Sequence, residues 1–244
     1  MKVVVAGKGG VGKTTLSGTL ARALARQGRQ VIALDADTNP MLGVSLGLGP
    51  EQTDLLLGVR QGLDTGETEH ERSTEGFVER FGRDAPDGVR LVVASRIEHP
   101  DPGCPCCGVS PERLLRELER ERQVVVGDLE AGVGTIRRLR EGDADVVVLV
   151  VQPTAKSLDV ARLALEVAEG KIAKVVVVAN RVRDEDDLQL IAAALPGHDL
   201  WVVPDDPVIA QADRDGRAPL DAGAAAPGVR AVVALADRLA VTAV

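Results

Sequence analysis

The residues best suited to chemistry in this chain form a glycine-rich run near its start, Gly7-Lys8-Gly9-Gly10-Val11-Gly12-Lys13-Thr14-Thr15. The run fits the pattern G-x-x-x-x-G-K-[ST] and lies between an apolar segment and a helical pattern, as phosphate-binding loops do. Its glycines let backbone N–H groups surround phosphate oxygens, and the positive end of the following helix dipole adds to the attraction. The alternative, a glycine-rich turn without a ligand, would need this context by coincidence.

The loop therefore predicts a nucleotide site with Mg²⁺. Lys13 is expected to reach the β- and γ-phosphates, and the Thr14 hydroxyl is expected to ligate Mg²⁺. The residues of the run that we predict to bind the nucleotide are Gly9, Gly10, Val11, Gly12, Lys13, Thr14 and Thr15.

Two carboxylates follow the second apolar run, Val31–Leu34. In an extended chain Asp35 and Asp37 face the same way, at the carboxyl edge of a sheet where open α/β folds bind their ligands. This spacing predicts that both carboxylates lie near the nucleotide. The structural alternative is that Asp37 caps the turn containing Asn39 and Pro40.

Another carboxylate follows a third apolar run, in Val124-Val125-Val126-Gly127-Asp128. An apolar strand that ends in Asp is typical of the second magnesium-handling segment of phosphate-loop proteins. Because Mg²⁺ keeps several waters and uses few carboxylates, Asp128 is expected to hold it through water.

A cysteine cluster, Gly103-Cys104-Pro105-Cys106-Cys107-Gly108, is the other chemically informative stretch. Pro105 favours an extended Cys104, so Cys104 and Cys106 point to one side and Cys107 points away. Two thiolates are too few for the four-ligand site of Zn²⁺ or a similar metal, but a two-fold symmetric dimer would supply four. This ligand count suggests a metal ion bound between two copies of the chain. The alternative is that the cysteines are small buried residues without a ligand.

These groups must be positioned by a regular framework, and short Val-rich runs alternate with helical patterns along the chain. Such runs are typical of strands buried on both faces, so we predict an α/β fold with a mainly parallel sheet of about seven strands flanked by helices. No linker divides the chain, and residues 1–244 are expected to form a single domain. The predicted strands are Val3–Ala6, Val31–Leu34, Leu91–Ala94, Val124–Val126, Val146–Val151, Val175–Ala179 and Leu200–Val203. The predicted helices are Thr14–Gln27, Pro111–Arg122, Leu158–Glu169 and Glu185–Leu195.

The polar stretch Glu51–Gly88 departs from this alternation. Phe77 and Phe81 within it are four residues apart and are expected to attach one short helix to the body. A lid or partner surface and a variable surface insertion are both compatible with the stretch.

Composition limits the possible functions. The 244 residues carry a net charge of −8, and only 1% are aromatic. This argues against a protein that grips nucleic acid with its whole surface or stacks RNA bases. No apolar run is long enough to span a membrane, and three clustered cysteines do not form a secreted disulfide framework. We expect a cytoplasmic protein that contacts neither membrane nor nucleic acid.

Lys8 carries a resemblance to a known superfamily. The run K-G-G-x-G-K-[ST]-T, beginning at Lys8, is the deviant Walker A form, and in it the chain resembles the MinD/ParA/nitrogenase iron protein superfamily of dimerising ATPases. The resemblance implies ATP hydrolysis, with Lys8 contacting the nucleotide phosphates of the other subunit and Asp37 near Mg²⁺ and the attacking water. It also implies that Asn180 reads the adenine edge. The further positions it implies at the nucleotide are Arg181, Pro204 and Asp205.

Across nearly its full length the chain also resembles CooC-type ATPases, the nickel-insertion accessory proteins of carbon monoxide dehydrogenase. The matching segments include the Lys8–Thr15 loop, Gly103–Cys106, Asp128–Gly132 and Pro204–Pro207. This resemblance implies a homodimer controlled by ATP, with one Ni²⁺ or Zn²⁺ bound by Cys104 and Cys106 of both subunits, and a client metalloenzyme. Two alternatives stay open: a MinD/ParA-type positioning ATPase and an ATPase bridged by an iron–sulfur cluster.

Overall fold

The computed structural model describes residues 1–55, 73–94, 111–118 and 123–241. Its strands form one eight-stranded sheet in the order β3-β4-β2-β5-β1-β6-β7-β8, and every neighbouring pair is parallel except β3 and β4. The strands are β1 Lys2–Gly7, β2 Gln30–Ala36, β3 Arg83–Ala85, β4 Val89–Val93, β5 Gln123–Leu129, β6 Val146–Val151, β7 Lys174–Val182 and β8 Leu200–Pro204.

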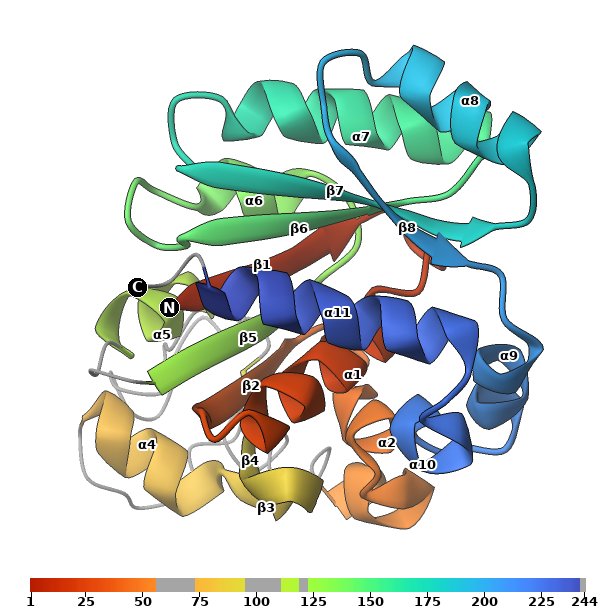
Figure 1. The fold of residues 1–244 in the computed structure, drawn as a ribbon. Coiled ribbons are helices and arrows are strands. Elements are labelled where there is room, and N and C mark those ends of the chain that lie inside the picture. Colours follow the sequence, from red (N-terminus) through yellow and green to blue (C-terminus); the bar gives the residue numbers. More distant parts are fainter. Residues whose placement is uncertain (56–72, 95–110, 119–122, 242–244) are drawn as a thin grey trace.

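Helices cover both faces of this sheet (Figure 1). They are α1 Lys13–Arg26, α2 Leu42–Leu46, α4 Thr74–Phe81, α5 Pro111–Glu117, α6 Gly134–Arg138, α7 Ala155–Ala168, α8 Glu185–Ala194, α9 Pro207–Arg214, α10 Pro219–Gly223 and α11 Pro227–Val241, with a short 3₁₀ turn, η1, at Pro86–Gly88. The predicted α/β architecture is confirmed.

The seven predicted strands are all present, and β3 is an additional one at the edge of the sheet. It spans only three residues, Arg83 and Asp84 in it are exposed, and it pairs antiparallel to β4. So short and polar a segment carries no apolar run, which is why the sequence pattern predicted about seven strands rather than eight.

The alternation of side chains along β1 divides the core into two layers. Val3 and Val5 pack with α1, α2 and α11, whereas Val4 and Ala6 pack with the helices of the other face. All four residues are buried, as expected for a central parallel strand. The layers hold β1 rigidly, so the loop that follows Gly7 is fixed at its base.

Two helices, α4 and α11, lie around this core. Phe77 and Phe81 are buried on α4 with ring centroids 5.0 Å apart, so the predicted short helix is confirmed. The terminal segment forms α11, which lies beside α1 on one face of the sheet (Figure 1). Trp201 donates its indole N–H to the Ala231 carbonyl and carries Arg238 over its ring, which anchors α11 to β8.

Candidate nucleotide site

The glycine-rich loop leaves the carboxyl end of β1 and enters α1, as predicted. Gly12 has a φ of 94°, and a Cβ there would lie 2.7 Å from Nδ2 of Asn180. At Gly7 a Cβ would lie 2.4 Å from the Val150 carbonyl oxygen. Since Gly12 has no side chain to cap α1, the N–H groups of the first turn stay directed at the loop. The loop therefore needs glycine at both positions and presents backbone donors to an anion.

Both lysines of the loop are held by its own backbone. Lys13 is buried, and its Nζ lies 3.4 Å from the Lys8 carbonyl oxygen. Burial lowers the pKa of Lys13, an effect opposed by the charges of Asp128 and Asp37. Lys8 is half-buried and donates from Nζ to the Gly9 carbonyl oxygen at 3.2 Å.

Two carboxylates lie buried directly beside the loop. Asp35 and Asp128 pair in register on β2 and β5, and each is 1% exposed. The Ser17 hydroxyl donates to Asp128 at 3.1 Å, and the Thr14 hydroxyl also hydrogen-bonds to it. Burial raises the pKa of Asp128 to about 6 despite these bonds and the nearby Lys13 charge. Burial, followed by the Asp128 charge, raises the pKa of Asp35 well above its usual range.

Asp35 and Asp37 have different hydrogen-bond partners, although they are only two residues apart. Asp35 accepts the backbone N–H groups of Leu42 at 2.8 Å and Asp37 at 3.2 Å, which fixes the turn into α2. Asp37 lies beyond the end of β2, is half-buried, and accepts the Asn39 N–H at 2.9 Å. Asp37 is nevertheless close enough for its charge to act on Asp35, and its turn-capping contact is present as well. The Asp37 charge also acts on Lys13 and Asp128.

This donor set fits Mg²⁺. The charges of Asp128 and Asp37 act on the buried Lys13 ammonium group, and Asp35 lies in register with Asp128. Burial is the main cause of the raised pKa values of Asp35 and Asp128, and a bound cation would stabilise their charged forms. The available ligands are carboxylate and hydroxyl oxygens, which Mg²⁺ prefers. Within the described ranges, no cluster of three or more His, Cys, Asp or Glu side chains is arranged to hold a metal ion by itself.

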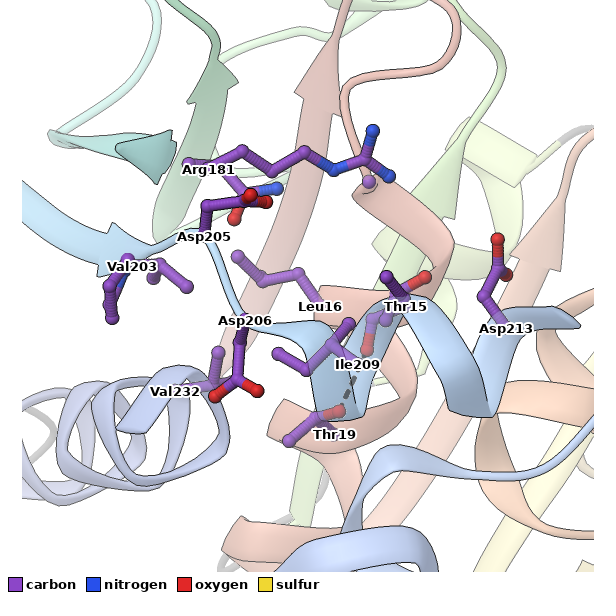
Figure 2. Close-up of a pocket in the computed structure, with 14 residues that line it drawn as sticks. Thr15, Leu16, Thr19, Arg181, Val203, Asp205, Asp206, Ile209, Asp213 and Val232 are labelled. Carbon is purple, nitrogen blue, oxygen red and sulfur yellow. Dashed lines mark hydrogen bonds between the residues drawn. The ribbon is translucent and has the colours of Figure 1, made fainter. Parts of the chain in front are cut away.

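A pocket continues from the loop along the start of α1 (Figure 2). Apolar side chains form much of its wall, with polar groups from the β7 end and the β8–α9 turn, as in sites that take a flat organic group. Its lining residues are Gly12, Thr15, Leu16, Thr19, Asn180, Arg181, Val203, Pro204, Asp205, Asp206, Ile209, Ala210, Asp213 and Val232.

This pocket is lined by the four residues that the resemblance implies at the nucleotide, Asn180, Arg181, Pro204 and Asp205. Asn180 uses Nδ2 to donate to the Val11 carbonyl at 2.7 Å, so the side chain joins the pocket to the phosphate loop. Arg181 has a φ of 57° at an irregularity in the pairing of β7 with β8, an uncommon conformation for a residue other than glycine. Strained backbone of this kind is often found at functional sites.

Residues 2–220 match the sequence pattern of the family described as CobQ/CobB/MinD/ParA nucleotide binding domain. The chain belongs to this family. An uncharacterized ATP-binding protein of Methanocaldococcus jannaschii is 33% identical over 199 residues, with 76% of this chain and 77% of that protein covered. The carbon monoxide dehydrogenase accessory protein CooC of Rhodospirillum rubrum is 32% identical over 232 residues and 88% of each chain.

Among solved structures, the fold is similar to the septum site-determining protein MinD of Pyrococcus horikoshii in complex with Mg-ADP. The TM-score is 0.66 at 22% identity, over 98% of this chain and 94% of that one. This likeness concerns the fold, whereas the family match identifies the chain as a nucleotide-binding protein.

Several residues of the candidate nucleotide site were missed by the sequence analysis. Gln152 donates from Nε2 to the Gly10 carbonyl at 3.4 Å, and Ser17 bonds to Asp128. Thr19 donates to the Thr15 carbonyl at 2.8 Å, as drawn in Figure 2. Gln152 directly follows β6, so its place at the carboxyl edge was a usable signal. The sequence held no such signal for Leu16, Ile209 and Val232, because they resemble ordinary core residues.

Cys104, Cys106 and Cys107 lie outside the described residues, so the predicted sulfur site remains a prediction. Of the helices in the described part of the chain, none is both long and apolar enough to cross a bilayer.

Proposed function

We propose that this family member is a cytoplasmic, homodimerising ATPase that carries a divalent metal ion. ATP and Mg²⁺ bring two subunits together, Cys104 and Cys106 of both subunits bind one Ni²⁺ or Zn²⁺, and hydrolysis reopens the dimer. The ion then passes to a client metalloenzyme such as a carbon monoxide dehydrogenase. The observation that carries the proposal is the presence, in one chain, of a two-lysine phosphate loop and a C-x-C pair. The similarity to CooC of Rhodospirillum rubrum supports the choice of client.

The residues at the loop have separate roles in ATP binding and hydrolysis. Lys13 offsets charge on the β- and γ-phosphates, and backbone N–H groups from Gly9 to Lys13 hold their oxygens. Thr14 and Asp128 would hold Mg²⁺, which when bound neutralises phosphate charge. Asp37 orients the water whose oxygen attacks the γ-phosphorus while the bond to the ADP oxygen breaks.

Two further groups complete this arrangement. Asp35 fixes the backbone N–H of Asp37 and so sets the position of that carboxylate. Lys8 of the partner subunit adds a second cation at the phosphates, in the manner of an arginine finger. Asn180, Arg181, Pro204 and Asp205 accommodate the base in the pocket of Figure 2.

Metal content per chain after anaerobic purification, with and without ATP, tests the proposal. We expect half an ion of Ni²⁺ or Zn²⁺ per chain in the dimer, lost in the Cys104→Ser/Cys106→Ser variant and retained in the matched control Cys107→Ser. Because thiolates rather than thiols bind the metal, binding should weaken in acid. Unchanged metal in the double variant would overturn the metal site.

The ATPase half has its own test. Lys8→Ala should reduce both ATP hydrolysis and ATP-dependent dimerisation, measured by light scattering, while nucleotide still binds through Lys13. Normal dimerisation and hydrolysis would contradict the role of Lys8 across the interface. Nucleotide-dependent binding to DNA or vesicles without bound metal would favour a MinD/ParA-type positioning role, and charge-transfer absorbance of a brown preparation would favour an iron–sulfur cluster.

A further inference from the structure

Ser17 on α1 is a buried hydroxyl at a position that faces the sheet. It is 0% exposed, follows the core residue Leu16 and precedes Leu20 and Ala21, which pack with the strands. Alanine forms helices better than serine does, and a buried hydroxyl is costly without a hydrogen-bond partner. Helix formation and packing therefore do not explain why this position holds serine, and the explanation must lie in the partner of its hydroxyl.

That partner is a carboxylate at the candidate nucleotide site. The Ser17 hydroxyl donates to Oδ1 of Asp128 at 3.1 Å, and the two residues are 111 positions apart in the chain. Asp128 lies near the carboxyl end of β5 and is itself 1% exposed. A hydrogen bond between buried groups is stronger than one in water, and stronger again when the acceptor is ionised. The bond therefore fixes one oxygen of Asp128 relative to the helix that begins at the phosphate loop.

Two hydroxyls of α1 bond to Asp128, and they differ in what else they can reach. Thr14 and Ser17 are three residues apart and so lie on the same face of the helix. Thr14 is half-buried at the end of the phosphate loop, where it is placed to serve a cation as well as Asp128. Ser17 lies one turn further from the loop and is fully buried. Ser17 can therefore affect a bound cation only through Asp128.

The neighbouring acid, Asp35, is held by a different kind of donor. It pairs in register with Asp128 and is equally buried, but it accepts the backbone N–H groups of Leu42 and Asp37. Those donors belong to the backbone of the turn into α2, which no exchange of a side chain removes. Asp128 accepts from side-chain hydroxyls of α1. Of the two acids, Asp128 is thus the one whose orientation a single side-chain substitution can change.

We propose that Ser17 is a positioning residue for Mg²⁺: its hydroxyl holds the Asp128 carboxylate in the orientation that binds the cation, and so strengthens the binding of Mg²⁺ together with the nucleotide. The inference rests on the proposed function, because it needs Asp128 at a Mg²⁺ ion. It goes beyond that function by assigning a role to a residue that touches neither the nucleotide nor the cation. Groups that orient a metal-binding side chain commonly change metal affinity by about 10- to 100-fold.

The test is the affinity for a fluorescent, non-hydrolysable ATP analogue, measured once in saturating Mg²⁺ and once in EDTA. In the parent we expect Mg²⁺ to strengthen binding by about 100-fold, and in Ser17→Ala by about tenfold or less, with the affinity in EDTA within about twofold of the parent. A merely structural role of Ser17 would lower both affinities alike, and that result would overturn the proposal.

A double variant shows whether Ser17 acts through Asp128. Once Asp128→Asn has removed the carboxylate, the additional change Ser17→Ala should reduce the Mg²⁺ effect no further, because residues that act as one unit are not additive. Losses that add in Ser17→Ala/Asp128→Asn would mean that the serine acts independently of Asp128, which contradicts the inference.

Thr53→Val is the matched control, because it removes another buried hydroxyl. Thr53 is 1% exposed and donates to the Gly49 carbonyl at 2.7 Å. The variant should keep the full Mg²⁺ effect, and a loss equal to that of Ser17→Ala would mean that any loosening of the fold suffices, against the proposal. A parent Mg²⁺ effect that survives in Ser17→Ala would overturn the inference alone. A parent whose nucleotide affinity does not depend on Mg²⁺ would overturn the magnesium site of the proposed function, and the role of Ser17 with it.

Discussion

Carboxylates in two regions of the molecule have pKa values that are shifted in opposite directions. At the carboxyl ends of β2 and β5, burial raises the pKa of Asp35 and Asp128. Burial acts in the same direction on Asp87 in η1, but hydrogen bonds from Arg22 and Arg26 more than offset it, and the pKa of Asp87 is lowered. Both regions lie along α1, the first at its start and the second toward its end.

The two regions differ in burial and in partners: Asp35 and Asp128 are each 1% exposed, whereas the Asp87 side chain is 22% exposed and is bonded to arginine. Asp128 and Asp35 accept hydrogen bonds from hydroxyl and backbone groups, and the buried Lys13 lies close to Asp128. Arg22, by contrast, donates from Nε to Asp87 at 2.6 Å and from both terminal nitrogens to Asp221, at 2.7 and 2.9 Å. An acid paired with the buried Arg22 holds elements together, whereas a buried acid without an arginine partner is suited to a cation that arrives with a ligand.

Removal of the arginine should have the largest effect on stability. Arg22 is 3% exposed and joins α1 to η1 and α10, so Arg22→Met leaves two carboxylates without their main cation. Because Asp221 is 42% exposed and can be hydrated, we expect a loss of about 2 to 4 kcal/mol in the free energy of unfolding, at or below the usual cost of breaking a buried pair. Urea denaturation measures it.

Arg26→Met is the control, because Arg26 also bonds to Asp87 but is largely exposed. Arg26→Met should lower the free energy of unfolding by less than about 1 kcal/mol. Nucleotide affinity should change little in either variant, and a large loss of Mg-ATP affinity in Arg22→Met with little loss of stability would break the distinction between the two regions.

Asp128→Asn is expected to stabilise the fold, whereas Arg22→Met is expected to destabilise it. A carboxyl group whose folded pKa is raised to about 6 favours folding below its unfolded pKa of 3.8, and this contribution is lost as the pH rises through 6. At pH 7 the neutral amide should therefore raise the free energy of unfolding by about 1 to 3 kcal/mol when nucleotide is left out. The gain should shrink toward pH 4, as measured by urea denaturation over that range.

The same variant should lose function as it gains stability. We expect Mg²⁺-dependent ATP affinity to fall about 10- to 100-fold, as for other groups that hold a metal through water. Asp159→Asn on α7, an exposed carboxylate paired with Arg162, should change neither quantity appreciably. A destabilised Asp128→Asn protein at pH 7 would mean that Asp128 is an ordinary structural acid.

The smallest effect is expected for Asp87→Asn. Asp87 has a φ of 61°, which asparagine tolerates well, so the substitution removes the charge without straining the backbone. The lowered pKa means that ionised Asp87 stabilises the fold above pH 3.8 and that this contribution disappears as the pH falls through the folded value. We expect a loss of about 1 kcal/mol in the free energy of unfolding at pH 7 that disappears below the folded pKa of Asp87, measured by thermal unfolding. A constant difference at every pH would exclude a charge effect.

The sequence predicted those parts of the fold and site that depend on residues close together in the chain. Seven strands were found because Val-rich runs buried on both faces have a pattern of their own, and the place of Lys13 at the start of α1 followed from a contiguous loop. The strand β3 was missed because three polar residues form no such pattern. For Asp37 the sequence left turn capping open as an alternative, and the structure shows this contact because β2 ends at Ala36 and Asp37 lies in the turn that follows.

The nucleotide-binding loop and the alternation of strands and helices were thus determined by the sequence alone, since local backbone geometry and burial on two faces leave a direct mark on neighbouring residues. Only the tertiary structure decided that Asp35 and Asp128 lie in register, that Arg22 reaches Asp221, and that Glu112 meets Arg138. Each of these contacts joins residues distant in the chain. Their strength depends on burial and partner charge, which exist only once the sheet has brought the elements together.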